Sequence, residues 1–141
     1  MSNDPPVRAR YFTPAEANAE LRVVRPLAEQ LAELIRSAQG LAQEVGGIGP
    51  GEVESHPRAS EFLELRSAIS SVSRQLTDLG VDVKGVEPIL LDFPGLRYGQ
   101  EVCLCWRQGE ESITAWHTDQ SGFSGRVPVE ATPVGAWEWC N

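Results

Sequence analysis

Two long stretches with apolar residues at helical spacing constrain the fold of this chain more than any other feature. Apolar residues recur in steps of three and four over residues 17–45 and again over residues 62–79. Such spacing places apolar side chains along one face of an α-helix. A glycine-rich segment, residues 46–51, separates the two stretches. The sequence therefore predicts an antiparallel helical hairpin over residues 13–80.

The ends of these helices also carry sequence signals. Thr13, Pro14 and Glu16 combine a helix N-cap, a proline at the first helical position and the glutamate of a capping box. Pro26 lies within the first helix and lacks a backbone donor, so we expect a bend or local break near it. Gly80 follows the second helix, where a left-handed residue commonly ends a helix.

Residues 101–117 form the densest run of apolar, aromatic and titratable residues, and they read as a β-hairpin. Two runs of strand-forming residues flank a turn that contains Gly109. With this turn, Cys103 faces Trp116, and Val102 faces His117. His117 then shares an apolar face that also holds Leu104, Trp106, Ile113 and Ala115. A one-residue change in the loop would reverse this partnering.

The segment before the hairpin supplies one more strand, over residues 87–92, and a turn over residues 93–99. The predicted fold class is α+β, a long antiparallel helical hairpin packed on a small three-stranded antiparallel β-meander. We expect a flexible tail over residues 1–10 and a single globular domain over residues 11–141. Within that domain, the meander and a C-terminal segment occupy residues 86–141, with Trp137 and Trp139 folded back onto the body.

Composition excludes several classes of protein. The net charge of −8 disfavours binding to nucleic acid and to an anionic membrane surface, because both need clustered Lys and Arg. No apolar run is long enough to span a bilayer, and the N-terminus lacks a signal-peptide pattern. The odd count of three cysteines argues against a disulfide scaffold. We therefore predict a reduced, cytoplasmic protein.

Several short motifs resemble those of a known family. These are Phe12-Thr-x-x-Glu16-Ala-Asn18, Leu91-Asp92-Phe93-Pro94, Cys105-Trp106-Arg107-x-Gly109-Glu110, Trp116-His117 and Gly122-Phe-x-Gly-Arg126. Together they resemble an uncharacterised bacterial family catalogued as domain of unknown function 2203. The resemblance runs from about Phe12 to Pro128. It implies a small cytosolic domain, supports the architecture above and supplies no mechanism.

The cysteines offer one candidate metal site. Cys103, Cys105 and Cys140 could join His117 around zinc, because thiolates and imidazoles are its preferred ligands. The predicted register places His117 on the other face from Cys103 and Cys105, which weighs against this grouping. Buried or half-buried thiols without a metal are the alternative.

A second candidate site is predicted at one end of the sheet. Asp92 ends the first strand, Glu101 begins the second, and His117 ends the third, so all three are expected together as ligands of a divalent metal or as groups for proton transfer. Residues of the adjoining loops, with Asp92, are candidates for ligand binding: Arg97, Tyr98, Asp119 and Arg126. Alternatively, the arginines pair with the carboxylates and hold the loops, and His117 caps the core.

The sequence contains no motif for a catalytic nucleophile, a phosphate-binding loop or a zinc protease. It therefore favours a non-enzymatic interaction or accessory module that needs no cofactor. Its expected partner is a second copy of the chain or another protein, bound through the helices. The alternative is a protein that binds a divalent metal or small ligand near His117, with hydrolysis as the candidate activity.

Overall fold

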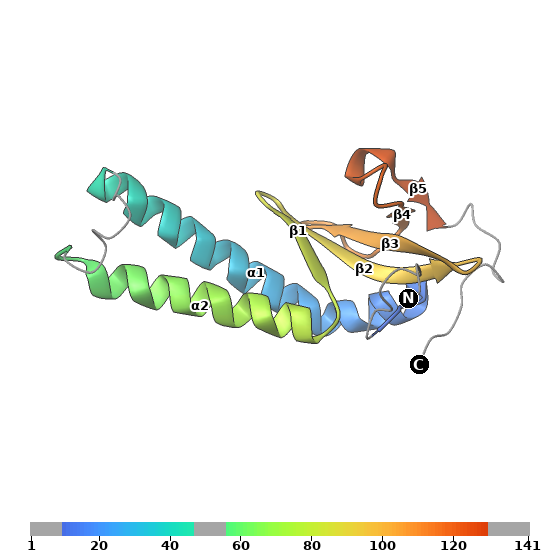
Figure 1. Cartoon of the computed structure of the whole chain (residues 1–141), viewed down its shortest axis with the longest axis horizontal. Coiled ribbons are helices and arrows are strands. Elements are labelled where there is room, and N and C mark those ends of the chain that lie inside the picture. Colours follow the sequence, from blue (N-terminus) through green and yellow to red (C-terminus); the bar gives the residue numbers. More distant parts are fainter. Residues whose placement is uncertain (1–9, 47–55, 130–141) are drawn as a thin grey trace, which may run out of the picture.

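A computed structural model describes residues 10–46 and 56–129 of the chain. The predicted α+β class is confirmed, with two helices and one antiparallel sheet whose five strands follow the chain order (Figure 1). The elements are α1 Pro14–Val45, α2 Ala59–Asp78, β1 Asp82–Val86, β2 Ile89–Arg97, β3 Gln100–Arg107, β4 Ala115–His117, the short 3-10 helix η2 Phe123–Gly125 and β5 Val127–Pro128.

The capping box at the start of α1 is confirmed. The Glu16 amide donates to Thr13 Oγ1 at 3.2 Å, and the Thr13 amide donates to Glu16 Oε1 at 2.9 Å. These two bonds satisfy amides that would lack partners in the first helical turn. The helix continues unbroken through Pro26 and ends at Gly46, whose φ of 73° is left-handed. Although Pro26 lacks a backbone donor, the helix has no break at this residue.

The two helices pack against each other and extend well beyond the sheet as a two-helix arm (Figure 1). We call the part of α1 from residue 34 onward, together with the N-terminal half of α2, the helical arm. Gly80, with a φ of 88°, turns the chain from α2 into β1. Neither helix is long and apolar enough to cross a membrane, within the part of the chain that the structure describes.

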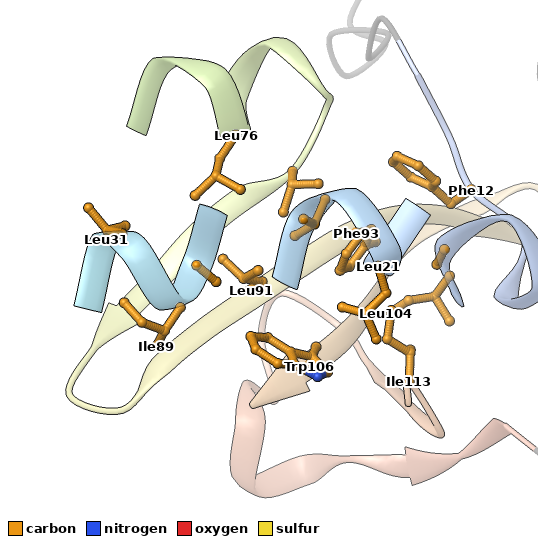
Figure 2. Packing of buried hydrophobic residues seen from close by; sticks show 14 of the residues in the cluster. Phe12, Leu21, Leu31, Leu76, Ile89, Leu91, Phe93, Leu104, Trp106 and Ile113 are labelled. Atoms are coloured by element: carbon orange, nitrogen blue, oxygen red, sulfur yellow. The ribbon is translucent and has the colours of Figure 1, made fainter. Parts of the chain in front are cut away.

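One face of the sheet and the sheet-covering half of α1 form the core (Figure 2). Leu91 and Phe93 of β2 and Leu104 and Trp106 of β3 are almost fully buried there. The helices contribute Leu21, Val24, Ala28, Leu31, Val72 and Leu76. Burial of each large apolar side chain contributes about 1.5–3 kcal/mol. Within the described residues, neither α1 nor α2 covers the opposite face of the sheet, which we call the helix-free face and which carries the polar residues described below.

The predicted three-stranded meander is too small. Residues 82–86, which lie outside the predicted strands, form β1, and the strand predicted over residues 87–92 runs from Ile89 to Arg97 as β2. β1 is an edge strand whose sequence, Asp-Val-Lys-Gly-Val, is mostly exposed or half-buried. Because β1 contains polar residues and a glycine, its sequence lacks the alternation of apolar residues that predicts a strand.

Pro94 lies inside β2, although proline is generally excluded from paired strands. β1 pairs with β2 only as far as Asp92, so that side of Pro94 has no neighbouring strand. The Pro94 carbonyl instead accepts from the Phe12 amide at 2.7 Å. In an antiparallel ladder the amide and carbonyl of one residue point to the same side. The missing amide of Pro94 therefore costs no ladder bond.

The predicted register of the β3–β4 hairpin is wrong by one residue. Cys103 pairs with His117 rather than with Trp116. The strands are joined by a seven-residue loop, over residues 108–114, that Asn18 of α1 holds in place. Asn18 Oδ1 accepts from the Ile113 amide at 2.7 Å, and its Nδ2 donates to the Ile113 carbonyl at 3.1 Å. A tight turn begins this loop, with the Glu110 amide donating to the Arg107 carbonyl at 2.9 Å, and Asn18, distant in sequence, holds the other end of the loop in this register.

Candidate metal centre

The corrected register brings three chemically active side chains together on the helix-free face of the sheet. Asp92 on β2, Cys103 on β3 and His117 at the end of β4 are 4%, 6% and 5% exposed. Each offers one donor atom, and these three atoms lie within 4.8 Å of one another. Pro94 is the β2 residue opposite Cys103. No long side chain from that position therefore separates Cys103 from Asp92.

Two hydrogen bonds fix the His117 ring. Its Nε2 lies 3.0 Å from Asp92 Oδ1, and its Nδ1 lies 2.8 Å from the Thr118 carbonyl oxygen. A carbonyl can only accept, so Nδ1 carries a proton and donates it. A second proton must lie between Nε2 and the Asp92 carboxyl, because that contact also needs a donor. Asp92 and His117 therefore share one proton in the metal-free protein.

Burial determines the protonation of the neighbouring acids. It raises the pKa of the Asp92 carboxyl, although the His117 ring and the Lys84 ammonium partly counteract the shift. Burial, with the Asp92 and Asp119 carboxylates, raises the pKa of the Cys103 thiol far above its usual range. The Cys103 thiol is therefore protonated, and it donates to Asp119 Oδ1 at 3.4 Å.

The geometry argues against a thiol nucleophile. Such a nucleophile is commonly activated by a ring nitrogen of a histidine that acts as its base. Both nitrogens of His117 are already occupied by Asp92 and Thr118. The raised pKa of the Cys103 thiol opposes formation of the reactive thiolate as well.

The same three groups match the donors of a zinc site. Zn²⁺ accepts thiolate, imidazole and carboxylate ligands, and catalytic zinc sites commonly have three protein ligands. A histidine that binds a metal usually donates its other ring nitrogen to a carbonyl or carboxylate. His117 has this arrangement, because its bond to Thr118 leaves Nε2 as the nitrogen that faces Asp92.

A pocket of about 200 Å³ opens beside this cluster. Besides Asp92 and His117, it is lined by Lys84, Leu90, Cys105, Asp119, Gly122 and Phe123. The segment between β4 and β5, which includes η2, lies over this face of the sheet (Figure 1). A metal held by the cluster would therefore border a space large enough for a small molecule.

Lys84 reaches the pocket from a β-bulge. Val83 pairs with Leu91 and Gly85 pairs with Leu90, so Lys84 between them has no partner on β2. Bulges change the direction of side chains and are frequent near functional sites. Sequence reasoning missed Lys84, because the strand that carries it was itself missed. One available signal was that Lys84 is the only lysine in the sequence.

Residues 10–129 match the family described as Uncharacterized conserved protein (DUF2203). The chain belongs to this family. The comparison with curated proteins gave no match, and neither did the comparison with solved structures. The matched segment of the DUF2203 domain includes all three residues of the candidate metal centre.

In the DUF2203 domain, Glu101 lies apart from Asp92 and His117, with which it was predicted to form a metal site. It is exposed and pairs with Leu96, whereas Asp92 pairs with Cys105 four positions further along β3. Cys103, and not Glu101, is the β3 residue whose side chain joins those of Asp92 and His117. Cys140, a ligand in the cysteine-based alternative, lies outside the described residues, as do Trp137 and Trp139.

The predicted ligand-binding residues of the DUF2203 domain are divided between several places. Asp119 lines the pocket and accepts from Cys103. Arg126 pairs with Glu110 at 3.0 Å and stacks on the Phe123 ring, so it holds the loop over the pocket. Arg97, the last residue of β2, lies away from the pocket, over the rings of Tyr98 and Trp116. Tyr98 itself is 59% exposed.

Proposed function

We propose that this DUF2203 domain binds a divalent transition metal, with Zn²⁺ as the best match, through Asp92, Cys103 and His117. The observation that carries the proposal is the convergence of a buried carboxylate, thiol and imidazole, with donor atoms within 4.8 Å of one another. A thiol selects against Mg²⁺ and Ca²⁺, which prefer oxygen ligands.

The energetics of the metal-free cluster support this proposal. Polar groups are costly to remove from water, and all three side chains are at least nine-tenths buried. Their mutual hydrogen bonds offset only part of that cost, as the raised pKa of the Asp92 carboxyl indicates. A divalent cation would stabilise the ionised carboxylate and thiolate together, and its binding would release protons.

Three protein ligands leave a fourth position on a tetrahedral metal. The pocket lined by Lys84 and Phe123 borders the cluster, so we place this position toward the pocket. The site therefore has the form used by proteins that exchange a ligand or a water molecule on the metal. Metal-assisted hydrolysis is the reaction class that such a site serves.

Two cysteine variants test the proposal with a matched control. Cys103 and Cys105 lie two residues apart on the same face of β3, and both are buried. Only Cys103 belongs to the proposed ligand set, because the Cys105 thiol is directed at the Ala115 carbonyl oxygen. After chelation and desalting, each protein is loaded with Zn²⁺ and its bound metal is measured by elemental analysis.

We expect one metal per chain in the parent and in Cys105→Ser. Cys103→Ser should weaken binding by about 100-fold or more, because it replaces a thiolate ligand. Co²⁺ substitution should give a thiolate-to-cobalt absorption band in the parent and in Cys105→Ser only. A parent protein that binds no metal, or a Cys103→Ser variant that binds it equally well, refutes the proposal.

A second candidate function is self-association through the helical arm. An apolar pocket of about 270 Å³ on the arm is lined by Ala38, Phe62, Leu63, Leu65, Arg66 and Ile69. Leu63 is 45% exposed. On α2 the exposed Glu64 lies toward the start and the exposed Arg74 toward the end, so two antiparallel copies of the helix would bring these opposite charges closer together. A second copy of the chain is therefore the occupant that we propose for this surface.

Light scattering tests the second candidate with two matched variants. Leu63→Asp places a charge on the arm, whereas Val23→Asp places one at an equally exposed apolar residue of α1 outside it. We expect the parent and Val23→Asp to be dimers and Leu63→Asp to be a monomer. A monomeric parent at high concentration refutes self-association.

A further inference from the structure

The position of Lys84 suggests which ligand the pocket takes. Lys84 is the only lysine in the sequence, and it is placed at the pocket by the bulge in β1. Its side chain is exposed, so its ammonium is available to a molecule that enters the pocket. Lys84 lines the same pocket as Asp92 and His117, which places it close to the cluster.

The charges around the pocket restrict the ligand further. With a divalent metal, the Asp92 carboxylate and the Cys103 thiolate form a neutral unit with a neutral His117. Lys84 then adds one positive charge, and the exposed Asp119 adds one negative charge at the same pocket. A ligand with a single negative charge would find a partner in Lys84, whereas a second negative charge would be repelled by Asp119.

The apolar part of the lining indicates the rest of the ligand. Leu90 and Phe123 face the pocket and are both half-buried. They provide a surface for a short hydrocarbon group, and the volume of about 200 Å³ limits its length. An oxyanion with a short apolar stem therefore matches the chemistry of this pocket.

We propose that the pocket binds a small monocarboxylate, whose carboxylate is held by the Lys84 ammonium and places one oxygen at the open position of the metal. This inference rests on the proposed metal site. The metal and the ammonium act on the same carboxylate, while the apolar stem lies toward Leu90 and Phe123.

The single lysine permits a direct test with butyrate as the probe. Zn²⁺-loaded protein is treated with an amine-modifying reagent, and modification of Lys84 is followed by mass spectrometry. The N-terminal amine is an internal control. We expect butyrate to slow modification of Lys84 while the rate at the N-terminus is unchanged. Phosphate, with its second negative charge, should protect Lys84 less than butyrate does.

Variants of Lys84 give an independent readout. Butyrate is titrated into the Co²⁺-substituted protein, and the visible spectrum of the metal reports on binding. We expect Lys84→Met to weaken butyrate binding by about tenfold, the loss expected for a hydrogen bond to a charged group. Lys84→Arg should retain most of the affinity, and Arg36→Met, which removes an exposed charge of α1, should retain all of it.

Failure of the inference and failure of the proposed function are distinguishable. A parent protein without bound metal overturns the metal site. A metal-loaded parent in which butyrate neither protects Lys84 nor changes the cobalt spectrum overturns the carboxylate site alone. The inference is also overturned if Lys84→Met loses the metal, because Lys84 would then serve the charge balance of the cluster. Thermal melts of each variant establish that it is folded.

Discussion

Replacement of His117 by alanine tests whether the Asp92–His117 pair stabilises the helix-free face of the sheet. The imidazole makes bonds of 3.0 Å to Asp92 and 2.8 Å to the Thr118 carbonyl, and its removal leaves Asp92 only 4% exposed without this partner. A buried group that loses its partner costs about 1–3 kcal/mol, and the cavity adds about 1 kcal/mol. We expect the free energy of unfolding to fall by about 2–4 kcal/mol.

Urea unfolding in the presence of a chelator measures this change without a contribution from metal. A double-mutant cycle with Asp92→Ala isolates the pair. The double variant should be more stable than the sum of the single effects predicts, by about 1–3 kcal/mol. Leu76→Ala, in α2 and outside the cluster, is the control and should be additive with His117→Ala. Additive effects of His117→Ala and Asp92→Ala would refute the reasoning.

The pH dependence supplies a second measurement on the same variant. Burial raises the pKa of the Asp92 carboxyl, and His117 opposes that increase, so the pKa rises further without the ring. An acid with a raised pKa in the folded state destabilises that state once it ionises. Stability is thus greatest below the unfolded pKa and falls as pH rises through the folded pKa. The penalty of His117→Ala should therefore grow as the pH rises above the usual pKa range of a carboxyl group.

Three further predictions concern other parts of the chain. Asn18→Ala should lower the free energy of unfolding by about 1–3 kcal/mol in urea, because it leaves two backbone groups of the β3–β4 loop without partners. Gly80→Ala should lower the free energy of unfolding by about 1–2 kcal/mol, because the φ of Gly80 is 88°. Gly40→Ala should raise the free energy of unfolding by about 0.5–1 kcal/mol, because Gly40 lies within α1 and an added methyl group there would meet no other atom. Burial raises the pKa of the Cys105 thiol to about 11, so alkylation followed by mass spectrometry at mildly alkaline pH should modify it in urea and not in the native protein.

The helices were predictable because their signals are local. The capping box of Thr13 and Glu16 and the spacing of apolar residues act within a few turns of one helix. The sheet was less predictable because its signals are not local. β1 is stabilised by pairing with β2, and its own residues, including Lys84 and Gly85, do not favour a strand.

The candidate site was predictable only in part, because it too depends on strand pairing between distant residues. Asp92 and His117 were singled out, and the structure brings their side chains into contact. The grouping of Cys103 with them depended on the register of β3 and β4. Asn18, which is 95 residues from Ile113 in the sequence, helps to hold that register. No property of the hairpin alone indicated this partner, so the predicted face of His117 was wrong.

Successive side chains of β3 alternate between the two faces of the sheet, so substitutions on one face have different consequences from substitutions on the other. Leu104 and Trp106 are packed against the helices, while Cys103 and Cys105, next to them in sequence, face the pocket side. A substitution at one of these cysteines therefore leaves the volume of the helix-facing core unchanged. It follows that the donor atoms of the proposed metal site can be redesigned, for example by exchanging thiol for imidazole, while the interior that determines the fold stays as it is.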